Sequence, residues 1–194
     1  MAYETIISGT APAITVATMV EGVVVQTATS TGISFPLGIT AAGIYPSGVR
    51  QIVVASLTAR TTTTAAFALG GTPPANTAGA EALTATIVPK SATSTLHITV
   101  NALVGITTPA VSTGHAIYRD SGAAIGATVN WQLTNAGTSV VSFTAVVASG
   151  STASTIFKYR FGVETASTAV LNGANTQYFG SAASTRITII EYGA

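Results

Sequence analysis

Several runs in the second half of the chain alternate apolar and polar side chains with a period of two residues. Val, Ile and Thr dominate these runs, and β-branched side chains favour strands because they pack well on a pleated sheet and lose rotamer freedom in a helix. Such alternation is typical of antiparallel strands with one buried face. We therefore predict strands over 96–104, 129–133, 141–147, 157–163 and 185–192, with Leu96, Val129, Trp131, Val141 and Phe157 on the inward faces.

Gly, Pro and Asn mark the turns between these runs, because they tolerate or fix the backbone angles that tight turns require. The clearest turn signals lie at 70–74, 120–122, 135–137 and 172–173. Many short strands separated by such turns, with no helical pattern between them, indicate a sandwich or jelly roll. We predict an all-β, antiparallel jelly-roll domain over residues 56–194.

Residues 1–55 differ from the rest, since Gly, Pro and Thr split their apolar stretches into short pieces. We interpret them as an N-terminal β segment or arm that attaches the protein to a larger particle. The first residues lack the basic start and apolar core of a signal peptide. The apolar stretch 17–25 is too short for a membrane span and is interrupted by Glu21. We expect synthesis in the cytoplasm and no contact with a membrane.

Charged residues are 7% of the chain, against about 25% in an average soluble domain. Soluble monomers usually carry both signs of charge at high density on their surface, and this chain has too few charges for that. We therefore expect part of the surface to be buried against other subunits. The net charge is +1 and the basic residues form no cluster, so nucleic-acid binding is not expected.

The sequence offers little for catalysis or for a cofactor. It has no Cys, which excludes disulfides, thiolate metal sites and Cys nucleophiles. His115 and Asp120 suggest a hydrolase, but no Gly-x-Ser-x-Gly motif is present and Asp120 lies in an Asp-Ser-Gly turn, where its side chain binds backbone. His97 and His115 lack the spacing of a zinc motif. We predict a protein without catalytic residues, metal or cofactor.

Aromatic residues are the first group of candidate contact residues, because aromatic side chains concentrate in cores and in subunit interfaces. Trp131 is the only Trp, and its place in an inward series favours core packing over a sugar-stacking platform. The residues that we assign to the core or to a trimer interface are Trp131, Phe157, Tyr159, Phe161 and Tyr192.

Charged residues of one strand are the second group. Lys158 and Arg160 share the face opposite Phe157 and Tyr159. One interpretation is a solvated face. The other is a subunit contact, in which these cations meet Glu164 or Glu191 of a neighbouring copy.

A series of short segments resembles a module found at the C-terminal ends of tailed-phage fibre and virion-surface proteins. The segments are 71–79 (GTPPANTAG), 83–94 (LTATIVPKSATS), 118–122 (YRDSG), 155–162 (TIFKYRFG), 171–173 (LNG) and 179–191 (FGSAASTRITIIE). Their order and spacing extend from about residue 57 to the end of the chain.

The resemblance implies a jelly roll like that of the complement globular head and tumour necrosis factor, which assembles as a homotrimer. It also implies a place on the virion surface of a bacteriophage, bound to the major capsid protein or another virion protein, after synthesis in the host cytoplasm. The chain is short and has no shaft, which favours a compact decoration, cement or short fibre component. The alternative is a tail-fibre or tail-tip protein that binds a receptor on the host cell. The resemblance transfers no catalytic residue.

Overall fold

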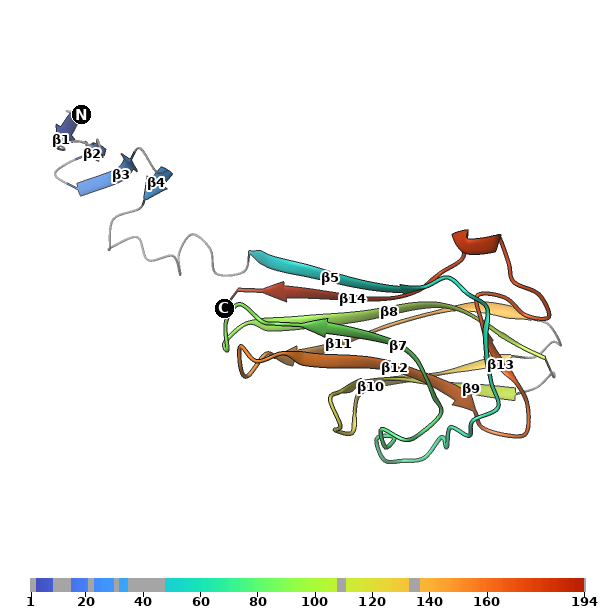
Figure 1. Cartoon of the computed structure of the whole chain (residues 1–194). Coiled ribbons are helices and arrows are strands. Elements are labelled where there is room, and N and C mark those ends of the chain that lie inside the picture. The colour runs from blue at the N-terminus through green and yellow to red at the C-terminus, as the bar shows by residue number, and fades with distance from the viewer. Residues whose placement is uncertain are drawn as a thin grey trace. The chain divides into compact units, whose positions relative to one another are not determined.

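The computed structural model describes four strands within residues 1–47, and residues 48–107, 111–132 and 137–193 (Figure 1). The chain divides into two compact units, Met1–Gly48 and Val49–Ala194. In the first unit, β1 (Tyr3–Ser8), β2 (Thr15–Val20), β3 (Val23–Thr29) and β4 (Gly32–Ser34) form an antiparallel sheet in that order.

The described residues of the second unit form ten strands and one short 3₁₀ helix. They are β5 (Val49–Leu57), β6 (Thr61–Thr63), β7 (Ala80–Ile87), β8 (Thr95–Ile106), β9 (Val111–Arg119), β10 (Ala124–Gln132), β11 (Thr138–Ala148), β12 (Thr155–Val163), β13 (Ala169–Leu171), η1 (Gly180–Ala182) and β14 (Thr185–Tyr192). None of the helical residues in the described part of the chain forms a segment long and apolar enough to cross a bilayer.

Two antiparallel sheets pack face to face in this unit (Figure 1). The first has the order β5-β14-β8-β11, with β13 and β6 continuing it beside the end of β8, and the second has the order β10-β9-β12-β7. Among the eight longer strands, taken in chain order, the sheets are therefore 1-8-3-6 and 2-7-4-5. This is the arrangement of a jelly roll, built from two Greek keys, and the predicted fold class is confirmed.

The core lies between the two sheets and contains most of the predicted inward series. Leu96 to Val104 on β8 and Phe157 to Val163 on β12 place alternate side chains there, all buried. On β11, Val141 and Ala145 are buried, and Phe143 packs against them half-buried. Burial of this apolar surface is the main stabilising contribution to such a sandwich.

The inward prediction is wrong for β10, where Val129 and Trp131 are each 55% exposed. Their polar neighbours point inward instead. Gln132 is buried, and the Asn130 side chain donates to Ser139 Oγ on β11 at 2.6 Å. Alternation in a sequence identifies the two faces of a strand but not which of them meets the core. Here the interior supplies hydrogen-bond partners for the polar face.

The domain boundary also differs from the one predicted at 55/56, because β5 belongs to the jelly roll. β5 pairs with β14, near the other end of the chain, in a register that matches Leu57 with Thr185 and Val49 with Tyr192. The boundary along the chain therefore lies between Gly48 and Val49. A local sequence pattern contains no information on a pairing between residues so far apart.

A segment without strands, residues 64–79, crosses the outer face of the β9–β12 pair and is called the strap here (Figure 1). Its buried Phe67 packs over Ala116 and Tyr118. Glycines make room for this ring, since a Cβ at Gly114 would overlap Phe67 and a Cβ at Gly162 would lie 3.0 Å from Phe67 Cβ. Phe67 N donates to Val163 O at 2.7 Å. The strap is thus a fixed part of the domain.

Candidate assembly surface

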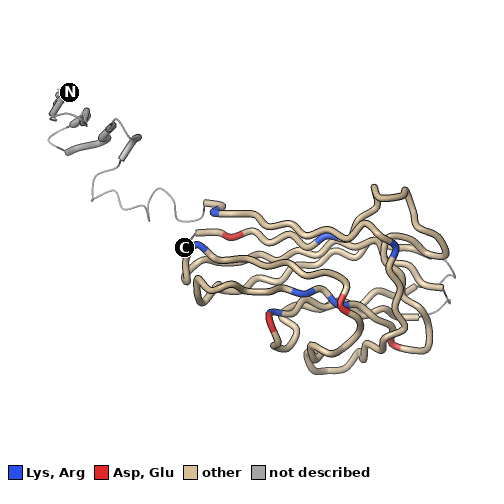
Figure 2. Tube along the Cα trace, viewed as in Figure 1, with Lys and Arg blue, Asp and Glu red and all other residues tan. Residues whose placement is uncertain are grey.

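The most distinctive surface of the jelly roll is the edge formed by β10 and β11. These strands come from residues 121–157, which contain no Asp, Glu, Lys, Arg or His. Charged residues lie on other strands and on turns, while β10 and β11 carry none (Figure 2). We call the surface of β10 and β11 the uncharged edge.

Large apolar side chains are exposed along the uncharged edge. Val140 is 73% exposed and Val146 56% exposed on β11, and Trp131 and Val129 project from the outer face of β10. Each strand lies at the end of its sheet, with a strand partner on one side only among the described residues. β11 pairs with β8 over eleven residues without a register shift. Natural proteins protect such long, regular edges with charges, Pro or bulges, and β11 has no charge, Pro or bulge.

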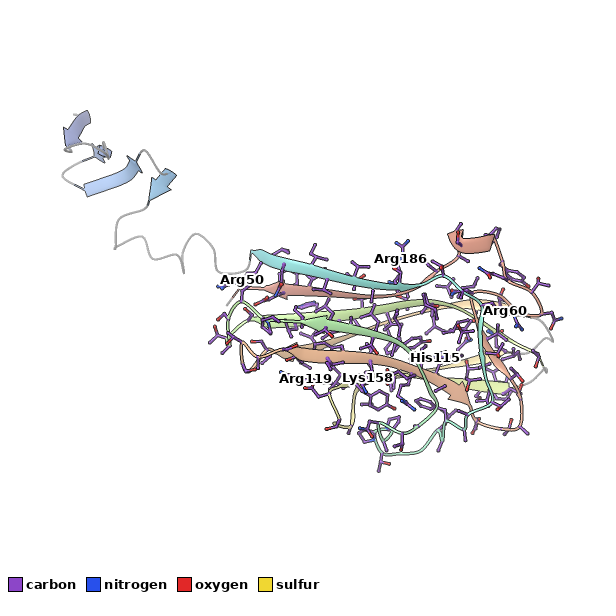
Figure 3. All side chains as sticks on the ribbon, viewed as in Figure 1. Arg50, Arg60, His115, Arg119, Lys158 and Arg186 are labelled. Carbon is purple, nitrogen blue, oxygen red and sulfur yellow. The ribbon has the colours of Figure 1, made fainter. Side chains whose placement is uncertain are left out.

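The outer face of the β5–β14–β8–β11 sheet adjoins this edge and is also poor in charge. One cross-strand row places Ile52, Ile190, His97 and Val146 side by side. The His97 ring meets the Tyr192 ring edge-on, with 4.8 Å between centroids. Tyr192, predicted for the core or a trimer interface, is therefore half-buried on this outer face. Arg186, four residues before Ile190 on the same face of β14, carries a charge and is hydrogen-bonded to Ser184 (Figure 3).

Behind the uncharged edge lies a buried polar network centred on His115 (Figure 3). His115 Nδ1 is 2.8 Å from Tyr159 Oη and its Nε2 is 2.9 Å from Thr113 Oγ1. Because the Thr113 hydroxyl donates to Asn130 O, it accepts from Nε2–H, and Nδ1 then accepts from the Tyr159 hydroxyl. With a neutral imidazole, every polar group in this series of hydrogen bonds has a partner. Burial lowers the pKa of His115 to about 3 and raises the pKa of Tyr159.

The predicted aromatic residues of β12 lie in the core of their own chain. Phe157, Tyr159 and Phe161 are fully buried, and the Tyr159 and Phe161 rings stack with 6.2 Å between centroids. Trp131 does not pack in the core and lies on the uncharged edge, so the structure leaves it available to a partner. The core packing that its place in an inward series favoured is therefore wrong, and only the interface remains of the two places assigned to it.

Lys158 and Arg160 find their carboxylate within the same chain. Lys158 Nζ lies 3.3 Å and Arg160 Nη1 3.6 Å from Glu81 on β7, while Arg160 also donates to Ala78 O and Gly79 O of the strap. Partial burial would raise the pKa of Glu81, but the Thr84 hydroxyl and the two cations outweigh it, and the pKa lies below its ordinary value. A contact of these cations with Glu164 or Glu191 of another copy stays a prediction.

Glu191 is fully buried at the end of β14. Its carboxylate accepts hydrogen bonds from Gln51 Nε2 at 2.5 Å, Lys90 N at 2.8 Å and Ser91 N at 3.3 Å. Burial raises the pKa of this group, but the Ser94 side chain and these donors outweigh it, and the pKa lies below its ordinary value. Within the chain, Glu191 holds the turn that joins β7 to β8. Glu164, by contrast, is exposed just after β12.

The residues weighed for catalysis or metal binding are held apart by structural roles. The Asp120 carboxylate binds backbone as predicted, but the donor is Ile156 N of β12, at 3.0 Å, and not the turn itself. His115 is enclosed in the core and His97 packs on Tyr192. Across the ranges that the structure describes, no three His, Asp or Glu side chains gather into a metal-binding group.

Comparison with known proteins gives no family assignment. No protein-family model matches the chain, and no curated protein matches it. Solved structures that are similar include the Gt strain of infectious bursal disease virus (12% identity, TM-score 0.41, 93% of this chain and 48% of that chain). The Gx strain aligns with 18% identity and a TM-score of 0.37, over 87% of this chain and 45% of that one.

A subviral particle of the same virus aligns with 13% identity and a TM-score of 0.34, over 93% of this chain and 48% of that chain. The chain thus spans about half the length of these solved chains. Likenesses at this level carry no argument about function, which has to come from the surface described above.

Proposed function

We propose that this protein is a non-enzymatic structural component of a bacteriophage virion, a homotrimeric jelly roll that decorates or cements the particle surface or forms a short fibre there. The observation that carries the proposal is the uncharged edge. A long edge strand with exposed Val140 and Val146 on the outer face of one sheet, beside an edge strand with exposed Trp131 on the outer face of the other, is a surface that a partner has to cover.

A second copy of the same chain is the partner that fits this surface. The whole protein is poor in charge, so the copies offer one another apolar surface without burying unpaired ions. Subunit interfaces are depleted of charge at their centre, as this edge is, and they favour aromatic residues such as the exposed Trp131. Assembly then stabilises each subunit by mass action and involves no turnover. The resemblance to phage surface modules supports three copies and a place on the virion.

A charge on the uncharged edge tests the proposal. In the variant Val140→Lys, association would bury an uncompensated ammonium, which costs about 3 kcal/mol or more and weakens association at least about a hundredfold. The matched control is Thr86→Lys, an exposed position on β7 at the opposite end of the second sheet. Light scattering across a dilution series would show trimers for the parent and the control, and smaller species for Val140→Lys. Trimers that tolerate Val140→Lys as well as Thr86→Lys would refute the assignment of this edge.

A second candidate function is recognition of the host cell surface by a tail fibre or tail tip. The turn that contains Phe179 favours it, because this side chain is 83% exposed beside the Tyr178 ring, next to β14 at the end opposite Val49. Electron microscopy of labelled particles would distinguish a head from a tail position. Adsorption of the purified protein to host cells would measure receptor binding directly.

A further inference from the structure

Phe179 is the most exposed large hydrophobic side chain in the described part of the chain. Its backbone also adopts the left-handed conformation, with φ 53° and ψ 22°. A bulky residue rarely occupies this region, and the cost, of order 1 to 3 kcal/mol, persists only where the surroundings enforce it. Strain of this kind in an exposed aromatic residue points to a contact outside the chain.

The turn around Phe179 is held by its own hydrogen bonds. Tyr178 N donates to Asn172 O at 3.0 Å, and Ala182 N donates to Phe179 O at 3.1 Å. The Gln177 amide donates to Gly180 O at 2.7 Å and to Thr58 O at 3.0 Å. The ring is therefore presented by an ordered turn, so that binding would cost little additional conformational entropy.

An apolar groove of about 480 Å³ lies beside the strap and β10. Leu69, Pro73 and Pro74 line it from the strap, and Ala127 and Val129 line it from β10, with Phe67 at its base. None of the residues that line it is ionisable. The groove is continuous with the uncharged edge through Val129. It therefore offers an aromatic side chain an uncharged receptacle at the surface that we assign to assembly.

The ring and the groove lie on different sides of the jelly roll. In Figure 1 the η1 turn rises beside β5 and β14, whereas the strap passes below β9 and β12. Because Phe179 is exposed, it does not occupy the groove of its own chain. A projecting residue on one side and a receptacle on the other define a heterologous contact, which closes into a ring when the rotation between copies allows.

We propose that Phe179 of one copy inserts into the groove between the strap and β10 of the next copy. This inference rests on the proposed self-association and adds its polarity: the contact is head-to-tail, and three such contacts close the trimer. Phe179 then serves as an anchor residue, packed against Leu69, Pro73 and Val129 of its neighbour.

The absence of Cys from the chain makes disulfide trapping a clean test. The double variant Phe179→Cys with Leu69→Cys is expected to form covalent multimers on mild oxidation. The single variants, and the control pair Phe179→Cys with Thr86→Cys, are expected to stay at the monomer mass on a denaturing gel. A disulfide within one chain would also run at the monomer mass and would contradict the proposal.

A substitution that keeps the backbone conformation measures the contact itself. Phe179→Ala retains a side chain with the same left-handed backbone cost but removes the ring, so we expect it to weaken association about thirtyfold, as for an anchor residue. Ser181→Ala, on the same turn, is the matched control and is expected to leave association unchanged.

The possible outcomes separate this inference from the function on which it rests. Trimers that tolerate Phe179→Ala and give no cross-link overturn the head-to-tail contact but not the assembly. A parent protein that remains a monomer at every concentration overturns both. If Phe179→Ala assembles normally and loses adsorption to host cells, Phe179 belongs to a receptor site and the proposed contact is wrong.

Discussion

The buried His115 makes the jelly roll sensitive to acid, with a magnitude that follows from its pKa. In the unfolded chain the imidazole titrates near its ordinary value of about 6.5, whereas burial lowers the pKa of His115 in the folded protein to about 3. Between these values the unfolded state binds one more proton. The free energy of unfolding is thus at its full value above about pH 6.5, as far as His115 is concerned, and decreases as the pH falls toward 3. At pH 4.5 the loss is about 3 kcal/mol.

The variant His115→Gln removes the titrating imidazole and provides a side-chain amide as hydrogen-bond partner for Thr113 and Tyr159. It lowers stability at pH 7.5, where the native network is intact, but it lacks the loss on acidification. Denaturation by urea at fixed protein concentration measures both proteins at pH 7.5 and 4.5. We expect the stability difference between parent and variant to shift by about 3 kcal/mol in favour of the variant at pH 4.5.

Tyr159→Phe is the control, because it removes one hydrogen bond of His115 and leaves the imidazole buried. It should lower stability by about 1 kcal/mol and keep the pH dependence of the parent. Acid-sensitive carboxylates, Glu81 and Glu191 among them, are common to all three proteins and cancel in the comparison. If the difference between the parent and His115→Gln changed by less than about 1 kcal/mol between the two pH values, the reasoning about His115 would be refuted.

Three further substitutions test the packing of Phe67 and the hydrogen bonds of two buried side chains. Gly114→Ala should displace Phe67 and lower the free energy of unfolding by about 3 to 5 kcal/mol, as much as Phe67→Ala. Gly71→Ala, with open space around it, is the control in urea denaturation. Equal stability of Gly114→Ala and Gly71→Ala would contradict the role of Gly114. Glu191→Gln should cost about 1 to 3 kcal/mol at pH 7, because a carboxylate that accepts from Lys90 N and Ser91 N is replaced by an amide. Since the folded pKa of Glu191 lies below its ordinary value, this cost should begin to shrink below about pH 4.5, and a cost at pH 3 as large as that at pH 7 would be inconsistent with it. Asn172→Ala should cost about 2 to 3 kcal/mol, since the amide donates to Leu57 O and Ala59 O and its oxygen accepts from Thr185; a thermal midpoint equal to that of the parent would exclude this role.

The fold class could be predicted because the information is local. Leu96 to Val104 and Phe157 to Val163 alternate over complete strands, and one side of each series is apolar enough to identify the core. Val129 and Trp131 alternate just as regularly, yet they point outward. Their placement depends on Ser139 of β11 and Val104 O of β8, which accept hydrogen bonds from the Asn130 and Gln132 side chains on the polar face of β10.

The candidate surface could hardly be predicted from the sequence, because it too depends on contacts between residues far apart in the chain. The pairing of β5 with β14 and the passage of the strap over Gly114 both join residues that are far apart in the chain. Lys158 and Arg160 were recognised as a charged strand face, but their partner Glu81 comes from another strand. Exposure of Phe179 results from a turn whose hydrogen bonds depend on Asn172 and Thr58.

Burial of the uncharged edge on association is the central claim, and the fluorescence of Trp131 tests it most directly. Trp131 is the only Trp and is 55% exposed on β10 in the single chain, so the emission reports this edge alone. We predict that acrylamide quenches it weakly where the protein has a mass of three times 19.3 kDa. Dilution to the monomer should then make quenching strong. Strong quenching that does not change between monomer and assembled protein would contradict the account.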